Sequence, residues 1–192
     1  MSEKQKEFIK NKVAKNGRHL VWIYAPAYTD GRKLDSNRVL EIVGMKLEKM
    51  TSPGKPEIEV KNPDFPAVRF RIGSSAQPLF AIKDESAIAV GYFKDSNDVA
   101  LAYKNLGDCT SWYCSLPLRN GDLMREIFRR SGAHIYNDKG DVIYTGGGLL
   151  CVHTRTGGKR DISLRNGKII EVELPANSTT LFDNDTGRIV LK

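Results

Sequence analysis

The sequence predicts an α/β fold with a layered sheet in residues 1–132, followed by a small antiparallel β-domain in residues 133–192. The apolar run HLVWIYA at residues 19–25 is typical of a strand that is buried on both faces of a parallel sheet. A helical pattern and a glycine precede it, which is half of a βαβ unit. A second such segment, GDCTSWYCS at residues 107–115, precedes an amphipathic helix. After residue 132, short strands alternate with glycine-bearing turns, which favours antiparallel hairpins.

The first segment is predicted to be a helix that leads into the apolar strand. Ser2 and Gln5 have the spacing of a capping box, in which each side chain satisfies a backbone N–H of the other residue. The pair Asn16-Gly17 ends the helix, because both residues tolerate the left-handed conformation at a helix C-terminus. The strand then ends at Pro26, and α/β proteins place their sites in such loops.

The middle of the chain is predicted to be irregular and mostly antiparallel. Ser36 is placed to cap a short helix that Gly44 ends. Residues 45–50 alternate apolar and charged side chains and are expected to form an edge strand, and residues 51–56 form a turn-rich connection. Short strands follow up to residue 95. Prolines are expected between these strands, because proline does not suit the interior of a central strand. The strands are expected at residues 58–60, 68–72, 79–82 and 87–93.

A further strand and a helix complete the first part. Residues 99–105 show apolar alternation, and residues 107–115 are expected to return to the parallel sheet. Asn120 caps a helix that carries an apolar face and ends at Gly132.

The last part is predicted to be a small sandwich or barrel. Residues 134–137, 141–145 and 149–154 are expected to form a three-stranded meander, with Gly146-Gly147-Gly148 as one of its turns. Four more strands follow, and the Asn166-Gly167 turn between the first two is a strong hairpin signal. These strands are expected at residues 160–164, 168–174, 178–182 and 188–191.

Two segments of this last part resemble the C-terminal region of large bacterial glycoside hydrolases of the β-galactosidase type. They are GAHIYND at residues 132–138 and DVIYTGGGLLCVHT at residues 141–154, and the segments 21–26, 107–111 and 180–183 also look like that family. In those proteins a catalytic barrel precedes a flavodoxin-like domain that resembles class I glutamine amidotransferases, often called the β-galactosidase trimerisation domain. A small β-domain comes next. The resemblance therefore implies a partial amidotransferase-like domain with a C-terminal β-domain.

The resemblance implies a fold and carries no catalytic residues. No segment looks like the catalytic barrel, so its paired carboxylates have no positions here. At the elbow where an amidotransferase has its nucleophilic cysteine, this chain reads Tyr24-Ala25-Pro26-Ala27-Tyr28, without cysteine or serine. The first strands of that fold are also missing from the chain. We therefore expect an open sheet edge, covered in a homo-oligomer or by a separate partner chain.

Composition narrows the function classes. The chain has 192 residues and a net charge of +7, concentrated in part in its first 18 residues. No basic face interleaved with aromatic residues indicates nucleic-acid binding, and no apolar run is long enough for a membrane span. As written, the chain is expected in the cytoplasm, or in the periplasm or outside the cell if it is a fragment of an exported enzyme. No cofactor is expected.

The cysteines and histidines leave two interpretations open. Cys109, Cys114 and Cys151 have neither a disulfide nor a zinc spacing, and we expect buried free thiols. The alternative is a thiol nucleophile at Cys109 with His134 or His153 as the base. Neither histidine has a metal-ligand spacing, and no metal site is expected. The glycines at residues 146–148 lack the lysine and helix of a phosphate loop.

The expected function is that of a non-catalytic accessory or oligomerisation domain related to carbohydrate-active enzymes. A carbohydrate-binding module is the first alternative, with Tyr28 and Trp112 as stacking residues and Asp108 as a polar ligand group near a strand end. An unrecognised hydrolase using Cys109 or Asp108 is the second. Loop carboxylates for a glycosidase pair are available, without a basis for choosing two of them. They are Asp30, Asp35, Asp64 and Glu85.

Overall fold

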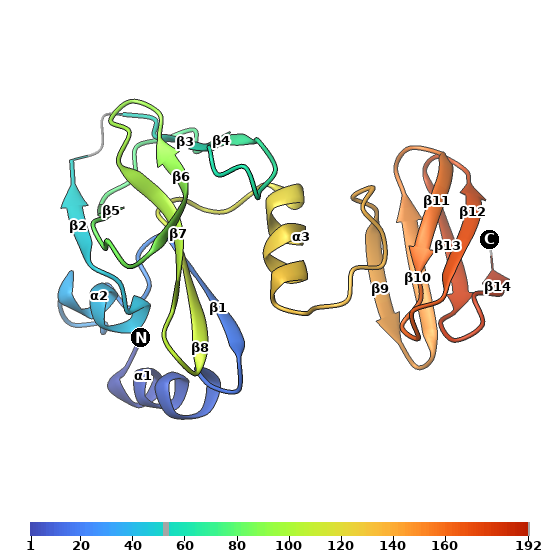
Figure 1. Ribbon diagram of the computed structural model, residues 1–192, viewed down its shortest axis with the longest axis horizontal. Helices are drawn as coiled ribbons and strands as arrows, with labels where there is room; N and C mark the ends of the chain where they lie inside the picture. The colour runs from blue at the N-terminus through green and yellow to red at the C-terminus, as the bar shows by residue number, and fades with distance from the viewer. Residues whose placement is uncertain (52–53, 192) are drawn as a thin grey trace. The chain divides into compact units, whose positions relative to one another are not determined.

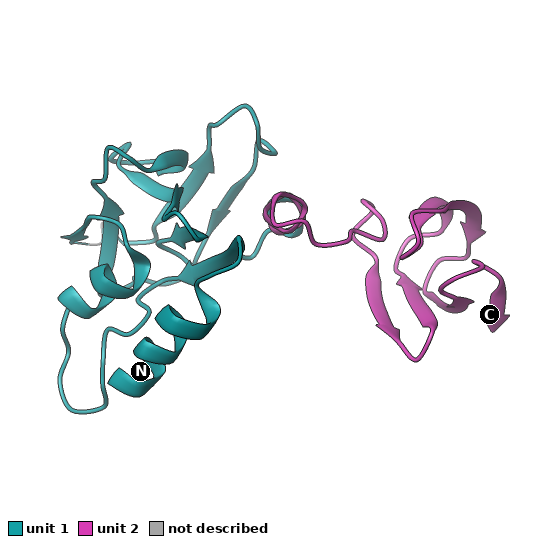
Figure 2. Cartoon of the chain, turned by 60° about the horizontal axis from the view of Figure 1, so that its bottom comes forward, with its two compact units in different colours: residues 1–123 teal, residues 124–192 magenta. Residues whose placement is uncertain are grey.

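A computed structural model describes residues 1–51 and 54–191 of the chain. The chain forms two compact units, Met1–Leu123 and Met124–Lys192, shown in different colours in Figure 2. The domain boundary expected after residue 132 stays a prediction. Of the turn-rich connection expected at residues 51–56, residues 52 and 53 lie outside the described part.

The first unit is mostly β-structure, built on a sheet that curls into a half-barrel (Figure 1). Within the described residues the sheet has eight strands, and its main path runs in the order β1-β8-β7-β6-β3-β4. Two further strands branch from β7, because β5 pairs with β7 and β2 pairs with β5. The strands are β1 (Arg18–Ile23), β2 (Leu47–Met50), β3 (Glu57–Val60), β4 (Arg69–Arg71), β5 (Leu79–Ile82), β6 (Ile88–Phe93), β7 (Val99–Asn105) and β8 (Cys109–Cys114).

The α/β fold expected for this unit is confirmed only in its parallel strand pair. β1 and β8 run parallel, with Leu20 opposite Ser111, whereas the other strand pairs of the described sheet are antiparallel. β1 also lies at the edge of the sheet, so its side chains are half-buried and not enclosed on both faces. The reason is that the antiparallel strands of residues 47–105 all add to the β7 side, and no strand of the described residues lies beyond β1.

The helices of this unit begin and end largely where local chemistry places them. α1 (Glu3–Phe8) has the expected capping box between Ser2 and Gln5, and a single π-helical turn, η1 (Ile9–Val13), continues it. α2 (Asn37–Val43) ends at Gly44, whose φ of 71° is adopted most easily by a residue without a Cβ. Its first turn is capped by the Asp35 carboxylate, which accepts from Asn37 N at 3.0 Å, and not by the Ser36 side chain.

A buried apolar layer joins α2 to the sheet. Val39 and Val43 of α2 pack with Phe80 and Ile82 of β5 and with Tyr113 of β8. This cluster therefore lies on the face of the sheet that α2 covers.

α3 (Gly121–Arg130) spans the boundary between the two units. The Asn120 side chain accepts from Leu123 N at 2.9 Å, so the expected cap is confirmed. Leu123 and Ile127 are buried, while Phe128 of the same helix is exposed. No helix in residues 1–51 and 54–191 is long and apolar enough to cross a membrane.

The second unit is a small antiparallel β-structure with its own core. One sheet has the order β14-β13-β10-β9, and β11 and β12 form a separate hairpin. Leu150, Val152 and Phe182 of the first sheet pack against Ile162 and Leu174 of the hairpin. The strands are β9 (Val142–Gly146), β10 (Leu149–Thr154), β11 (Gly158–Ser163), β12 (Ile169–Leu174), β13 (Ser178–Asp183) and β14 (Ile189–Leu191).

The prediction of a first strand in this unit, at residues 134–137, is wrong. Residues 134–137 form a loop, and the remaining two strands of the expected meander are the hairpin β9–β10. The loop is held because Ser163 N donates to Tyr136 O at 2.8 Å, while the Tyr136 ring packs against the core. β10 takes β13 as its second neighbour instead.

Candidate functional site

The elbow after β1 is the place where this fold positions a strained backbone. Tyr24 directly follows the strand and has a φ of 66°, and Ala27 has a φ of 59°. Such values are rare for residues with a Cβ and persist only when the surroundings hold them. Here Tyr24 N donates to Cys114 O at 2.8 Å, and the buried Tyr113 hydroxyl donates to Tyr24 O at 2.6 Å.

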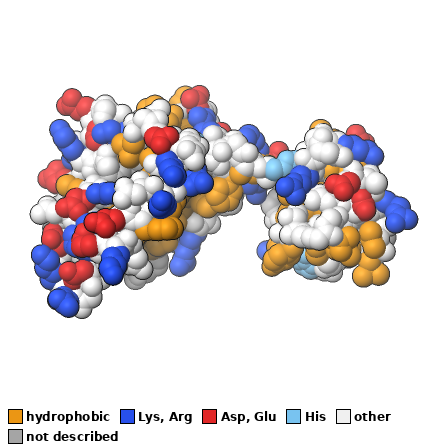
Figure 3. Space-filling model, turned by 90° about the horizontal axis from the view of Figure 1, so that it is seen from below, with side chains coloured by type: hydrophobic (Ala, Val, Ile, Leu, Met, Phe, Trp, Pro, Cys, Tyr) orange, Lys and Arg blue, Asp and Glu red, His pale blue; other side chains and the backbone are white. Residues whose placement is uncertain are grey.

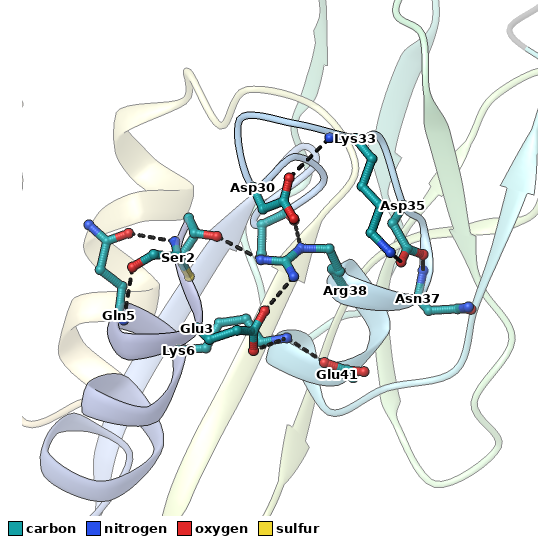
Figure 4. Close-up of polar contacts among 12 residues, drawn as sticks. Ser2, Glu3, Gln5, Lys6, Asp30, Lys33, Asp35, Asn37, Arg38 and Glu41 are labelled. Atoms are coloured by element: carbon teal, nitrogen blue, oxygen red, sulfur yellow. Dashed lines mark hydrogen bonds and ion pairs between the residues drawn. The ribbon is translucent and has the colours of Figure 1, made fainter.

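A buried cation, Arg38, holds the second strained residue of the elbow, Ala27, and Figure 4 shows its guanidinium bonded to Glu3 of α1. The Arg38 guanidinium donates from Nε to Ala27 O at 3.1 Å and from Nη2 to Met1 O at 2.7 Å. It also forms an ion pair with Glu3. In the described contacts, the Arg38 guanidinium bonds to oxygen atoms of Ala27, Met1 and Glu3. These contacts fasten the elbow to the first helix.

A second buried cation belongs to the same cluster. Lys6 pairs with Glu41 of α2 and, at 3.3 Å, with Glu3. The hydrogen bond to Glu41 and the charge of Glu3 raise the pKa of Lys6 against the opposing effect of burial. Both buried cations therefore have carboxylate partners, which is the usual requirement for burying a charge. The cluster ties α1 to α2.

Tyr28 lies at the end of this elbow and is only partly accessible. Its ring meets the Phe80 ring edge-on, with 6.3 Å between centroids, and packs against the main core. Part of the ring is therefore committed to packing against the core.

Trp112 lies in the interior of the sheet. Its side chain is 1% exposed, stacks on Tyr103 with 4.5 Å between ring centroids, and meets Phe65 edge-on. Its indole Nε1 donates to His19 Nδ1 at 3.1 Å. The ring sits mid-strand in β8, on the face that Phe65 covers, and so presents no free face for a sugar. His19 was not singled out by the sequence, since no motif marks it.

Asp108 lies at the opposite end of the parallel strand pair from Tyr28. It directly precedes β8, and its carboxylate accepts from Asn16 N at 2.9 Å, while its carbonyl accepts from Gly17 N. Asp108 therefore fastens the turn before β1. Because β1 and β8 are parallel, the three predicted ligand-binding residues fall at the start, the middle and the end of the strands, and do not form one site.

The thiols of the first unit are in positions that suppress reactivity. Burial and the nearby Asp108 charge raise the pKa of Cys109, and burial raises the pKa of Cys114 to about 12. A thiol must ionise to act as a nucleophile. The proposed bases have other partners, because His134 Nε2 bonds Ser163 O and His153 Nδ1 bonds Thr179 Oγ1.

A surface groove beside α2 contains a carboxylate, Asp84, that accepts four hydrogen bonds. Asp84 accepts from Lys46 N at 3.1 Å and Lys104 Nζ at 2.9 Å through one oxygen, and from Ser86 N and Oγ through the other. Burial alone would raise the pKa of Asp84, but the hydrogen bonds from Ser86, Lys104 and Lys46 outweigh it and lower the pKa strongly. A carboxylate held ionised in this way does not serve as a general acid.

The other loop carboxylates have structural contacts or lie apart. Asp30 accepts from the backbone N–H groups of Arg32 and Lys33, and Asp35 caps α2. Glu85 lines the groove of Asp84, and Asp64 lies in the loop after β3. In residues 1–51 and 54–191, no group of three or more histidines, cysteines or carboxylates has the arrangement of a metal site.

The second unit exposes an apolar sheet face that the sequence did not single out. Tyr144 is 68% exposed and lies directly opposite Cys151, which in turn lies opposite Leu181. Val142 and His153 form the neighbouring pair on the same face. Figure 3 shows hydrophobic side chains gathered along one side of this unit, with a histidine among them. Alternation along β9 was visible in the sequence, but which face meets the core was not.

Comparison with known proteins finds similarity in structure and none in sequence. No family model matches the chain, and no curated protein matches it in sequence. Two solved β-galactosidases are similar in structure. The enzyme from Rahnella sp. R3 has a TM-score of 0.55 at 12% identity over 93% of this chain. The polyextremophilic enzyme from the Antarctic haloarchaeon Halorubrum lacusprofundi has a TM-score of 0.63 at 14% identity over 97% of this chain.

The likeness covers only part of each enzyme. This chain spans 29% of the first β-galactosidase and 30% of the second. Sequence identities at this level establish a shared fold and do not by themselves transfer an activity. The chain therefore has the fold of a β-galactosidase-related part.

Proposed function

We propose that the chain is a non-catalytic accessory domain related to glycoside hydrolases, whose role is to assemble with another polypeptide. The observation that carries the proposal is the structural likeness, which takes in nearly the whole of this chain but under a third of each β-galactosidase. The open edge at β1 supports an assembling role. An apolar edge strand with unpaired backbone groups on its outer side is a template for another strand. The partner is a second copy of the chain or a separate polypeptide.

The parallel pair β1–β8 supports an amidotransferase-like origin for the first unit. A helix precedes β1, and the strained Tyr24 elbow follows it, which is where enzymes of that class carry their nucleophile. The phenol of Tyr24 does not replace a thiol there, because burial raises its pKa. The elbow is retained as structure, and the proposed role is assembly.

An activity screen tests the non-catalytic part of the proposal. The purified chain is incubated with a panel of nitrophenyl glycosides beside a β-galactosidase as the positive control. We expect no turnover above buffer. Turnover that co-purifies with the chain and disappears in a variant of one of its own carboxylates, such as Glu85→Gln, would overturn the proposal.

The exposed face of the second unit favours carbohydrate binding as the second candidate function. Sugars stack on exposed aromatic rings, and Tyr144 presents such a ring beside the polar pair His153 and Thr179. Tyr28 and Trp112, the residues predicted from the sequence, are engaged in packing instead.

A thermal-shift screen against mono- and oligosaccharides tests this candidate. A sugar at about 100 times its dissociation constant adds about 2.7 kcal/mol of stability and raises the melting temperature. We expect Tyr144→Ala to abolish the shift and Tyr28→Ala to retain it. If no sugar shifts the melting temperature, or if Tyr144→Ala leaves the shift intact, this face is not the binding site.

A further inference from the structure

The backbone of β1 is unpaired on its outer side. The register sets Ile23 opposite Cys114, and Tyr24 N donates to Cys114 O at 2.8 Å. Backbone groups of successive strand residues point alternately to the two sides, so Leu20 and Trp22 bond to β8 as Tyr24 does. The N–H and C=O groups of His19, Val21 and Ile23 therefore point away from β8. In the part of the chain that the structure describes, no hydrogen bond reaches them from another element.

This edge lacks three of the features with which proteins protect exposed strands. Between His19 and Ile23 there is no proline and no charged side chain, and the β1–β8 register contains no bulge. Burial lowers the pKa of His19, so its ring is neutral at pH 7. Ile23, at the end of the strand, is 41% exposed. Figure 1 shows β1 as the outermost strand of the sheet, beyond β8.

We propose that β1 pairs with β1 of a second copy of this chain, antiparallel about a twofold axis at Val21, so that the two curled sheets become one. The inference rests on the proposed function, because it specifies how the chain assembles. Val21 then lies opposite the partner's Val21, and His19 lies opposite the partner's Ile23.

The direction of the backbone groups selects this register. In an antiparallel pair, bonded residues must both point their N–H and C=O groups toward the partner strand, and each such pair exchanges two bonds. The outward-pointing residues His19, Val21 and Ile23 meet one another only when the axis lies at one of them. An axis at His19 runs into the Gly17 turn, and an axis at Ile23 runs into the elbow, so Val21 gives the longest ladder.

The side chains are complementary in the same register. Leu20 lies opposite the partner's Trp22, and valine meets valine on the other face, so apolar rows continue across the junction. Arg18, the one charged residue of β1, lies opposite the partner's Tyr24, and no like charges face each other. A second copy therefore fits this edge without an unpaired charge.

Proline at an outward-pointing residue is the sharpest test. Val21→Pro removes an N–H that only the partner uses, and proline is tolerated in edge strands whose N–H faces away from the sheet. Sedimentation velocity of the full chain over a range of protein concentrations should show a dimer for the wild type and a monomer for Val21→Pro. Far-ultraviolet circular dichroism verifies that the variant is folded.

A pair of charge substitutions provides a second test that does not alter the backbone. Ile23 and Ile88 are both exposed isoleucines of the same unit, but Ile88 lies in β6, away from the edge. We expect Ile23→Lys to dissociate the dimer and Ile88→Lys to leave it intact. If a dimer persists in both Val21→Pro and Ile23→Lys, the β1 pairing is overturned, whereas assembly as such stands.

A cysteine crosslink tests the register. The twofold axis brings the two Val21 Cα atoms to about 5.5 Å, a separation that a disulfide spans. In a Cys151→Ser background, Val21→Cys should form a disulfide-linked dimer under mild oxidation, and Leu106→Cys, exposed elsewhere, should not. A wild type that is monomeric at every concentration overturns pairing with a second copy. Association of that monomer with a separate chain, lost in Ile23→Lys, then identifies the other partner class.

Discussion

Asp84 is a residue whose charge contributes to the stability of the first unit. Its side chain is 6% exposed, and its carboxylate accepts hydrogen bonds from Lys46, Ser86 and Lys104. Asp84→Asn breaks these charged contacts and should lower the free energy of unfolding at neutral pH by about 2–4 kcal/mol. Urea unfolding measures the loss, with the exposed neighbour Glu85→Gln as the matched control.

The same carboxylate makes stability depend on pH. The folded-state pKa of Asp84 is lowered, so its contribution is complete above the unfolded pKa of about 4 and is lost as pH falls toward the folded pKa. The difference between wild type and Asp84→Asn should therefore shrink below about pH 4. A difference that stays constant down to low pH would show that the carboxylate is not held in its ionised form.

The thiols provide a second prediction at the scale of single residues. Cys109 and Cys114 are buried with raised pKa values, whereas Cys151 is only half-buried on a sheet face. In the native protein, a disulfide reagent such as Ellman's should modify Cys151 first and the other two thiols slowly, and Cys151→Ser should remove the fast phase. Rapid modification of Cys109 would restore the thiol-nucleophile hypothesis.

At the scale of elements, the connection between β10 and β11 depends on a close backbone approach. A Cβ at Gly157 would lie 2.8 Å from Ala176 N and 3.1 Å from Leu174 O, and these backbone atoms cannot turn aside. Gly157→Ala should cost about 1–3 kcal/mol, as for overpacked interiors. Gly146→Ala is the matched control, because nothing lies within 4 Å of its Cβ position. Equal urea midpoints for the two variants would contradict the close approach.

Local rules predicted elements whose cause is local. The Ser2–Gln5 capping box, the Gly44 helix end and the hairpin at Asn166-Gly167 depend on residues adjacent in sequence, and all three are confirmed. The prediction of the first strand of the meander was wrong. Its residues form a loop that is held by a hydrogen bond from Ser163, which lies far along the chain from Tyr136.

Sites were harder to predict than elements, because burial depends on distant partners. The charge of Asp84 is held by Lys104, and Trp112 is covered by Phe65, and neither pairing leaves a signal in sequence spacing. Tyr144 and Trp112 look alike as strand aromatics, and only the tertiary fold makes one exposed and the other buried.

At the scale of the whole molecule, the sequence predicted that β1 and β8 belong to a parallel sheet, but it predicted neither that they pair with each other nor that β1 lies at the edge. Strand order is decided by long-range pairing, and the antiparallel strands between residues 47 and 105 all joined the far side. That outcome leaves the edge open, as the resemblance implied, and makes the first unit mostly β-structure.

Self-association through that edge would couple stability to protein concentration. Only the folded chain can dimerise, so dimer formation stabilises the folded state. The melting temperature of the wild type should therefore rise with protein concentration. Ile23→Lys should melt at a temperature that does not depend on concentration. Differential scanning calorimetry over a wide dilution series measures both, and a wild-type melting temperature that is independent of concentration would contradict the coupling.

Both tryptophans of the chain, Trp22 and Trp112, lie in the first unit, and the second unit contains tyrosines but no tryptophan. Light absorbed at the red edge of the aromatic band is therefore emitted by the first unit alone. Trp112 is sealed in the sheet, whereas Trp22 belongs to the open strand and donates its indole N–H to Ser111. The molecule thus carries an intrinsic optical reporter at the edge where a neighbouring strand would arrive, with the second unit silent.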